Sequence, residues 1–207
     1  SPEAFFAKAE PVLKTVITNP AIDLKAVAAL VQPRCEILSD LPERVDFIDK
    51  LPEYSTELYV HKKSKTTLEN SLSSLQAIVP VLEGLQTWTN ESLYEALVAL
   101  AAKLEVKNSI VLWPLRVAVS GKASTPGGAT ELCALLGKEE SLARIRTGIE
   151  RRFCSLHNAM TISIGLDHAA QALTWIQQVL IGPRVATERP AVDLDPGPAR
   201  QIGFIHD

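Results

Sequence analysis

The chain has almost no net charge. Its 207 residues contain 21 lysines and arginines against 24 aspartates and glutamates, which leaves a formal charge of −3. A chain this close to neutral does not hold nucleic acid by its overall charge. Any nucleic-acid site must therefore be a local arrangement of a few basic residues.

Cysteine is scarce, and long apolar runs are missing. The three cysteines, Cys35, Cys133 and Cys154, are odd in number, far apart, and form no CxxC pair or ligand-spaced set with the histidines. This pattern favours reduced thiols in a cytoplasmic protein. No apolar run approaches the roughly 20 residues that cross a membrane. The first residues, 1–6, lack the basic and apolar regions of a signal peptide and resemble the middle of a longer protein.

Helical periodicity is what the sequence does contain, within an ordinary composition of 46% apolar and 22% charged residues. Apolar residues recur at helical spacing from the first residues to about position 152, and sustained two-residue alternation is absent. The best strand candidate is 110–119, and Pro114 within it counts against a central strand. The pattern predicts an all-α protein.

Several residues predict where the helices begin and end. The pair Asn19-Pro20 should end a first helix, Asp23 should cap the next, and Pro33 should kink or split it. The run 66–69, Thr-Thr-Leu-Glu, fits a capping box that opens a further helix at Thr66. Residues 129–136 should form a short helix that ends at a glycine, and the following helix should run from 138 to about 152.

The character of the sequence changes after residue 152. Residues 168–181 could form one more helix, and the remainder is rich in proline and polar residues, which predicts a weakly ordered C-terminal tail over 153–207. Three origins remain open for this tail. It could be an extension with its own partner, an artificially added segment, or translation past a frame disruption.

One ordered string of about 28 residues is more specific than any of these signals. It lies at 112–139, and further matching runs lie upstream of it. The matching runs are LWPLRVAVSGK (112–122), TPGG (125–128), ELCALLGKE (131–139), EYSTELYVHKK (53–63), WT (88–89), QPR (32–34) and LSDLP (38–42). Together they resemble the C-terminal anticodon-binding region of bacterial glutamyl-tRNA synthetases over about residues 1–152.

The resemblance implies two helical lobes, about 1–60 and 61–152, that bind the anticodon loop of a glutamate tRNA. In the family, an arginine in each lobe reads anticodon bases, and a Thr-Pro-Gly turn touches the same loop. The residues that match these roles, or flank them, are Arg34, Arg116, Lys122, Ser124, Thr125, Pro126 and Gly127. Gly128 departs from members that have a larger apolar residue there.

The chemistry of arginine suits this role independently of the family. Its planar guanidinium can form two parallel hydrogen bonds with a base edge and can stack on an unpaired base. Bases in a loop are accessible for such readout. However, an arginine in an apolar segment, as Arg116 is, more often pairs with a carboxylate or a helix C-terminus, and a TPGG turn is usually only a loop before a helix.

The function expected is therefore tRNA recognition by part of an enzyme that joins glutamate to tRNA using ATP. The chain contains neither the HIGH-type nor a convincing KMSKS-type motif, nor a Rossmann glycine loop, so we expect no aminoacylation by this chain alone. We expect ATP and magnesium to bind the missing catalytic domain, and no cofactor to bind here. We further expect a cytoplasmic monomer that binds no DNA or membrane. The alternative is a helical protein–protein interaction domain without RNA binding.

Overall fold

The computed structural model describes residues 1–164, with side chains through Arg151. This part is α-helical, with three short 3-10 turns and an isolated bridge between His61 and Thr66, and it contains no strand. The all-α prediction is confirmed. The helices are α1 (Pro2–Val16), α2 (Leu24–Val31), α3 (Leu41–Val45), α4 (Leu68–Gly84), α5 (Asn90–Lys103), α6 (Asn108–Ser120), α7 (Ala129–Leu136) and α8 (Lys138–Ile164).

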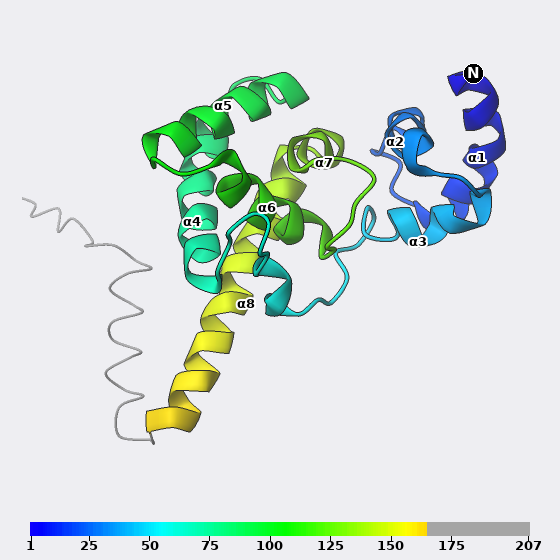
Figure 1. Cartoon of the computed structure of the whole chain (residues 1–207). Coiled ribbons are helices and arrows are strands. Elements are labelled where there is room, and N and C mark those ends of the chain that lie inside the picture. The colour runs from blue at the N-terminus through cyan, green and yellow to red at the C-terminus, as the bar shows by residue number, and fades with distance from the viewer. Residues whose placement is uncertain (165–207) are drawn as a thin grey trace, which may run out of the picture. The chain divides into compact units, whose positions relative to one another are not determined.

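The first three helices pack on one another. Helix α1 contacts both α2 and α3 (Figure 1). The Asp23 side chain accepts a hydrogen bond from the Lys25 backbone N–H and so caps α2, as predicted. Pro33 splits the pattern as expected, because α2 ends at Val31 and a 3-10 turn, Gln32–Arg34, follows. That turn carries Arg34.

The later helices form a second group, in which α6 is central. Helix α6 packs on both α4 and α7, and α5 packs on α4, α6 and α7. Residues 110–119, the strand candidate, belong to α6, with Pro114 inside the helix. The buried positions of α6 are Val111, Pro114, Leu115, Val117, Ala118, Val119 and Ser120. One side chain of this helix that stays partly accessible is Arg116.

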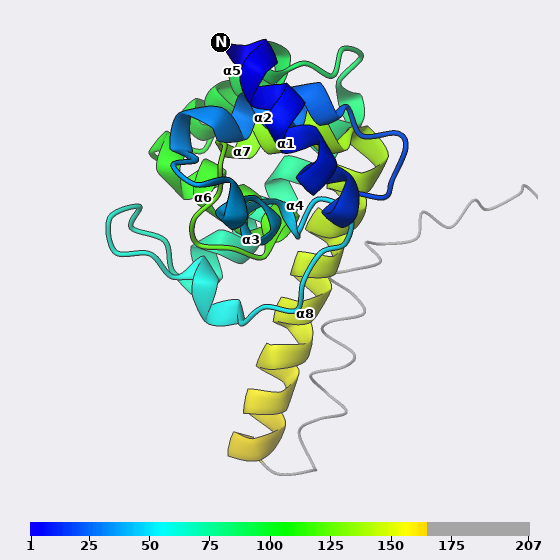
Figure 2. The ribbon, with the colours of Figure 1, turned by 90° about the vertical axis from the view of Figure 1, so that its right-hand side faces the viewer.

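Two predicted boundaries were wrong. The cap of α4 is Thr67 with Asn70, not Thr66 with Glu69, because the Thr66 backbone and hydroxyl are bonded to His61. Helix α8 continues to Ile164 rather than ending near 152, and its later turns project beyond the other helices (Figure 2). No proline or glycine interrupts 152–164, and the next glycine or proline along the chain is Gly165. The helix predicted at 168–181 and the remaining tail lie outside the described residues.

A buried arginine of α8 connects the two helical groups. Arg144 is 2% exposed and donates hydrogen bonds to the carbonyl oxygens of Phe47, Ile48 and Val119 at 2.7–2.8 Å. Its Nε also donates to Glu140 at 2.6 Å. Arg144 thus ties the segment after α3 to the C-terminal end of α6. The predicted division into lobes at residue 60 stays a prediction, and this contact crosses it.

Candidate functional site

The loop between α6 and α7, residues 121–128, is built on backbone conformations that its sequence permits. Gly121 ends α6 with φ of 67°, in the left-handed region that favours glycine. A Cβ atom at this position would lie 2.8 Å from Cδ1 of Tyr54. Gly121 therefore allows both the turn and its close approach to residues 52–54.

The centre of the loop docks on α2. Pro126 and Gly127 are buried, and a Cβ atom on Gly127 would lie 2.7 Å from Cδ1 of Leu30 in α2. The Thr125 hydroxyl donates a hydrogen bond to the Gly127 carbonyl at 2.6 Å. Ser124 is exposed and Thr125 half-buried. In this structure Pro126 and Gly127 hold the loop in place, while Ser124 and Thr125 present polar groups to solvent.

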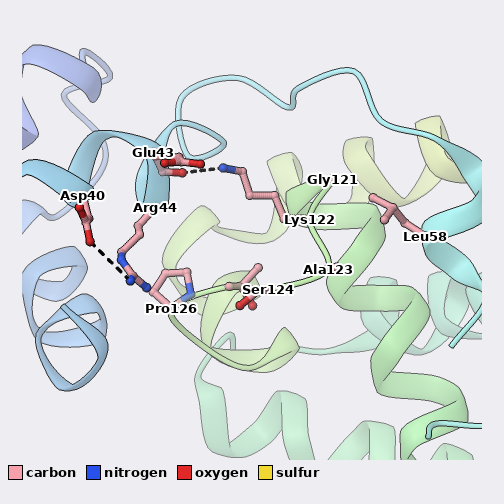
Figure 3. Close-up of a pocket in the computed structure, with 10 residues that line it drawn as sticks. Asp40, Glu43, Arg44, Leu58, Gly121, Lys122, Ala123, Ser124 and Pro126 are labelled. Atoms are coloured by element: carbon pink, nitrogen blue, oxygen red, sulfur yellow. Dashed lines mark hydrogen bonds and ion pairs between the residues drawn. The ribbon is translucent and has the colours of Figure 1, made fainter. Parts of the chain in front are cut away.

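Lys122 has its amine occupied by α3. Its Nζ lies 2.6 Å from the Asp46 carboxylate and donates a hydrogen bond to the Glu43 carbonyl (Figure 3). Figure 3 also shows Arg44 of α3 reaching toward Pro126, with its guanidinium 3.9 Å from Asp40. The predicted RNA contact of Lys122 stays a prediction. These contacts tie the loop to α3 and to its C-cap residue Asp46, in addition to the contact with α2.

Arg116 projects from α6 beneath the same loop. One terminal nitrogen donates to the Ala123 carbonyl at 2.9 Å, and the guanidinium carbon lies 4.4 Å from the centre of the Trp113 ring. Its Nε is buried and has no hydrogen-bond partner among the described residues. Burial lowers the pKa of the Arg116 guanidinium, and the positive charge of Arg34 lowers it further.

A cavity of about 710 Å³ brings together five of the seven predicted site residues. Both predicted arginines line this cavity, which we call the arginine cleft. The predicted residues that line it are Arg34, Arg116, Ser124, Thr125 and Gly127. Lys122 and Pro126 line an adjoining pocket with Asp40, Glu43 and Arg44 (Figure 3). Ser124 and Thr125 border both pockets, so the 121–128 loop is the wall between them.

Eight further lining residues of the arginine cleft were not in the predicted set. The four with charged or aromatic side chains are Glu57, His61, Lys63 and Trp113. The His61 and Trp113 rings stack in parallel, with centroids 3.7 Å apart and planes 6° from parallel. The Trp113 indole N–H donates to the Leu58 carbonyl at 2.9 Å. The basic run at 61–63 was the available sequence signal, but nothing local indicated that it folds against α6.

The charges of the arginine cleft are unbalanced. Within the part of the chain that the structure describes, neither Arg34 nor Arg116 forms an ion pair, and Glu57 is the one carboxylate among the lining residues. The ordinary role of an arginine in an apolar segment, pairing with a carboxylate, does not account for Arg116. Two neighbouring cations without counterions favour a ligand that brings negative charge or hydrogen-bond acceptors.

The arrangement suits the binding of a ligand. The cleft offers guanidinium donors and the exposed Ser124, which together match an acceptor-rich ligand. Among the described residues, no group of three or more His, Cys, Asp or Glu side chains could hold a metal ion. No helix in the same range is long and apolar enough to span a membrane.

Comparison with known proteins agrees with this geometry. The model of the family "Anticodon binding domain" matches residues 4–149. Curated relatives include the glutamate–tRNA ligase of Clostridium tetani, 53% identical over 149 residues, and that of Clostridium kluyveri, 49% identical. Each match covers 72% of this chain and 30% of the relative, so the chain spans less than a third of the length of these relatives.

Solved structures share the fold. A glutamate tRNA ligase from Elizabethkingia meningosepticum matches 72% of this chain and 29% of its own, with a TM-score of 0.59 and 24% identity. A glutamate-tRNA synthetase from Elizabethkingia anophelis matches 72% of this chain and 28% of its own, with a TM-score of 0.55 and 21% identity. Because the family model covers well over half of the sequence, the chain belongs to the anticodon-binding domain family, as its resemblance to glutamyl-tRNA synthetases over about residues 1–152 indicated.

Proposed function

We propose that this chain recognises the anticodon loop of a glutamate tRNA as part of a glutamate–tRNA ligase, and that the arginine cleft is the binding site. The observation that carries the proposal is the pair Arg34 and Arg116, two cations that line one cleft without an ion-pair partner among the described residues. The relatives named above are glutamate–tRNA ligases, which supports the choice of tRNA.

Arg116 is held in the free protein at a cost that RNA binding could offset. Burial and the repulsion from Arg34 both disfavour the charged guanidinium of Arg116 in the free protein. A base edge with acceptor atoms, or a phosphate nearby, would bind the terminal nitrogens of the partly accessible Arg116 side chain and offset the cost of holding its charge there. The interaction is directional, because the stack on Trp113 and the bond to Ala123 fix the plane of the guanidinium. A fixed fork of donors can distinguish one base from another.

Arg34 would act from the opposite helical group. It follows α2 on an exposed 3-10 turn, so its side chain is free to close on a loop that is already held by Arg116. Ser124 and Thr125 would contact the same loop through a hydroxyl and backbone groups. Pro126, Gly127 and Lys122 would contribute chiefly by fixing the 121–128 loop between α6 and α3.

The other steps of the reaction belong elsewhere in this proposal. ATP and magnesium would bind a catalytic domain that is a separate part of the enzyme, and this chain would bind no cofactor of its own. The chain alone would not transfer glutamate to tRNA. As part of a tRNA ligase it would act in the cytoplasm, as a monomer.

Binding of an anticodon stem-loop tests the proposal. Arg116→Ala should weaken binding by about tenfold or more, because a good bidentate contact with a base contributes about 1–3 kcal/mol. The matched control is Arg146→Ala, which removes an exposed arginine of α8 that pairs with Glu83. The control should bind as the unchanged chain does. If Arg116→Ala and Arg146→Ala bind alike, and a changed anticodon makes no difference, the chain is better explained as a protein-interaction domain.

A further inference from the structure

Residues 61–66 form a tight turn that projects a run of basic residues. The backbones of His61 and Thr66 exchange two hydrogen bonds of 3.2 Å, and the His61 N–H also lies 3.0 Å from the Thr66 hydroxyl. Lys65 adopts a positive φ of 58°, which closes the turn. The consecutive residues Lys62 and Lys63 therefore lie on a turn whose two ends are held together by hydrogen bonds. We call residues 61–66 the basic turn.

The basic turn is fastened from inside by His61. The Ser64 backbone N–H donates to Nδ1 of His61 at 3.2 Å, and the Ser64 hydroxyl lies 2.8 Å from the same nitrogen. The other attachment is the parallel stack of His61 on Trp113 of α6. Ser109 of α6 adds a hydrogen bond to the Ser64 carbonyl at 3.3 Å. The turn is thereby bound to the helix that carries Arg116.

Lys62 and Lys63, two of the three exposed lysines of this turn, differ in one respect. Lys63 lines the arginine cleft with Arg34 and Arg116, whereas Lys62 does not. Neither forms an ion pair with a described residue, and the cleft offers Glu57 as its one lining carboxylate. A flexible ammonium beside two guanidiniums adds positive charge without adding the planar fork that reads a base edge.

We propose that Lys63 binds the backbone phosphate of the loop nucleotide whose base contacts Arg116. We further propose that His61 is the positioning residue that holds Lys63 at the cleft. This inference rests on the proposed function. Phosphate is the ligand assigned because a lysine amine acts as a compact point charge, which suits a phosphate oxygen more than a base edge. The nucleotide would then be held at two points: its base by α6, and its backbone by the basic turn.

The salt dependence of binding separates a phosphate contact from a base contact. For a single-stranded segment, each phosphate that is neutralised contributes about 0.7 to the slope of log affinity against log salt. Lys63→Gln should reduce that slope by about this amount and weaken binding about tenfold at low salt, the loss expected for a charge-assisted hydrogen bond. Because a phosphate carries no sequence information, the ratio of affinities for matched and changed anticodons should stay the same.

Lys62→Gln is the control, since it removes the same charge from the same turn outside the cleft. It should change neither the slope nor the affinity by a comparable amount. Equal effects of Lys62→Gln and Lys63→Gln would overturn the inference, and so would a Lys63→Gln chain that loses anticodon preference rather than overall affinity. A third outcome separates the two proposals. If the unchanged chain shows no anticodon preference, but the salt slope still falls in Lys63→Gln and not in Lys62→Gln, the proposed function is refuted and the phosphate contact stands.

A double-mutant cycle tests the role of His61. If His61 positions Lys63, then Lys63→Gln should weaken binding much less in a His61→Ala chain than in the unchanged chain. A merely structural histidine would lower stability but leave the effect of Lys63→Gln intact. Additive losses in the cycle would therefore overturn the positioning role.

Discussion

Arg34 carries a charge that contributes nothing evident to folding. It is exposed, forms no ion pair with a described residue, and its charge lowers the pKa of Arg116. Arg34→Gln should therefore leave the free energy of unfolding within about 0.5 kcal/mol of the unchanged chain, as expected for a surface substitution. The same variant should bind the anticodon stem-loop about tenfold more weakly. Urea denaturation and a binding titration measure the two quantities, and a stability loss that matches the binding loss would contradict the assignment.

Two cysteines should differ sharply in reactivity. Burial raises the pKa of the Cys133 thiol to about 12, whereas Cys35 is only partly buried. In a Cys154→Ser chain at pH 8, iodoacetamide should label Cys35 in the folded protein and Cys133 only after unfolding. Mass spectrometry of the labelled peptides measures this. Rapid labelling of Cys133 in the folded chain would show that the α7 core opens readily.

The same thiol makes stability depend on pH in a definite direction. The folded chain keeps the Cys133 proton up to about pH 12, while the unfolded thiol, with an ordinary pKa near 9.0, releases it earlier. The contribution of this group is therefore complete below about pH 8.5 and declines as the pH rises through the unfolded value. Cys133→Ala should remove this part of the alkaline loss.

At the scale of elements, the helix caps show where sequence reasoning worked and where it failed. Asp23 was predicted as a cap, and its side chain accepts the expected backbone hydrogen bond. The cap of α4 was misplaced by one residue because the local pattern favours Thr66, which has a glutamate three residues later, over Thr67, which has an asparagine there. The fold of the basic turn excludes Thr66 as the cap, because it commits that residue to His61.

Substitution of the two threonines separates their roles. Thr67→Ala removes a cap whose hydroxyl accepts from the Asn70 N–H, so it should lower stability by about 1 kcal/mol. RNA binding should be unaffected, because the basic turn remains closed. Thr66→Ala instead removes the hydroxyl that the His61 N–H contacts. Chemical denaturation of both variants is the measurement, and a stability loss confined to Thr66→Ala would contradict the corrected cap.

At the scale of the whole molecule, Arg144 connects the first helical group, which carries Arg34, to helix α6, which carries Arg116. It bonds to carbonyls on both sides of the predicted lobe boundary, and one of them, Val119, lies in the helix of Arg116. Arg144→Met should lower the free energy of unfolding by about 3 kcal/mol, because three buried carbonyls lose a charged donor. Arg146→Met, which removes an exposed arginine of the same helix, should stay within about 1 kcal/mol. Equal losses in the two variants would show that Arg144 does not connect the groups.

The arginine cleft itself was only partly predictable from sequence. The resemblance placed Arg34, Arg116 and the 121–128 loop at one site, and the cleft that they line is consistent with that expectation. Lys63 and His61 were not assigned to the site, because their place depends on a ring stack with Trp113, more than 40 positions away in the sequence. Arg144 escaped notice for the same reason, since its hydrogen bonds to Phe47 and Ile48 join distant segments that no local pattern relates.

The most direct test of the central claim compares two RNA stem-loops of identical length and charge. One carries the glutamate anticodon, and the other the same loop nucleotides in scrambled order. At a single fixed salt concentration the unchanged chain should prefer the first by about tenfold or more, and Arg116→Ala should abolish that preference. Equal affinity of the unchanged chain for both RNAs would contradict the claim that the arginine cleft reads an anticodon.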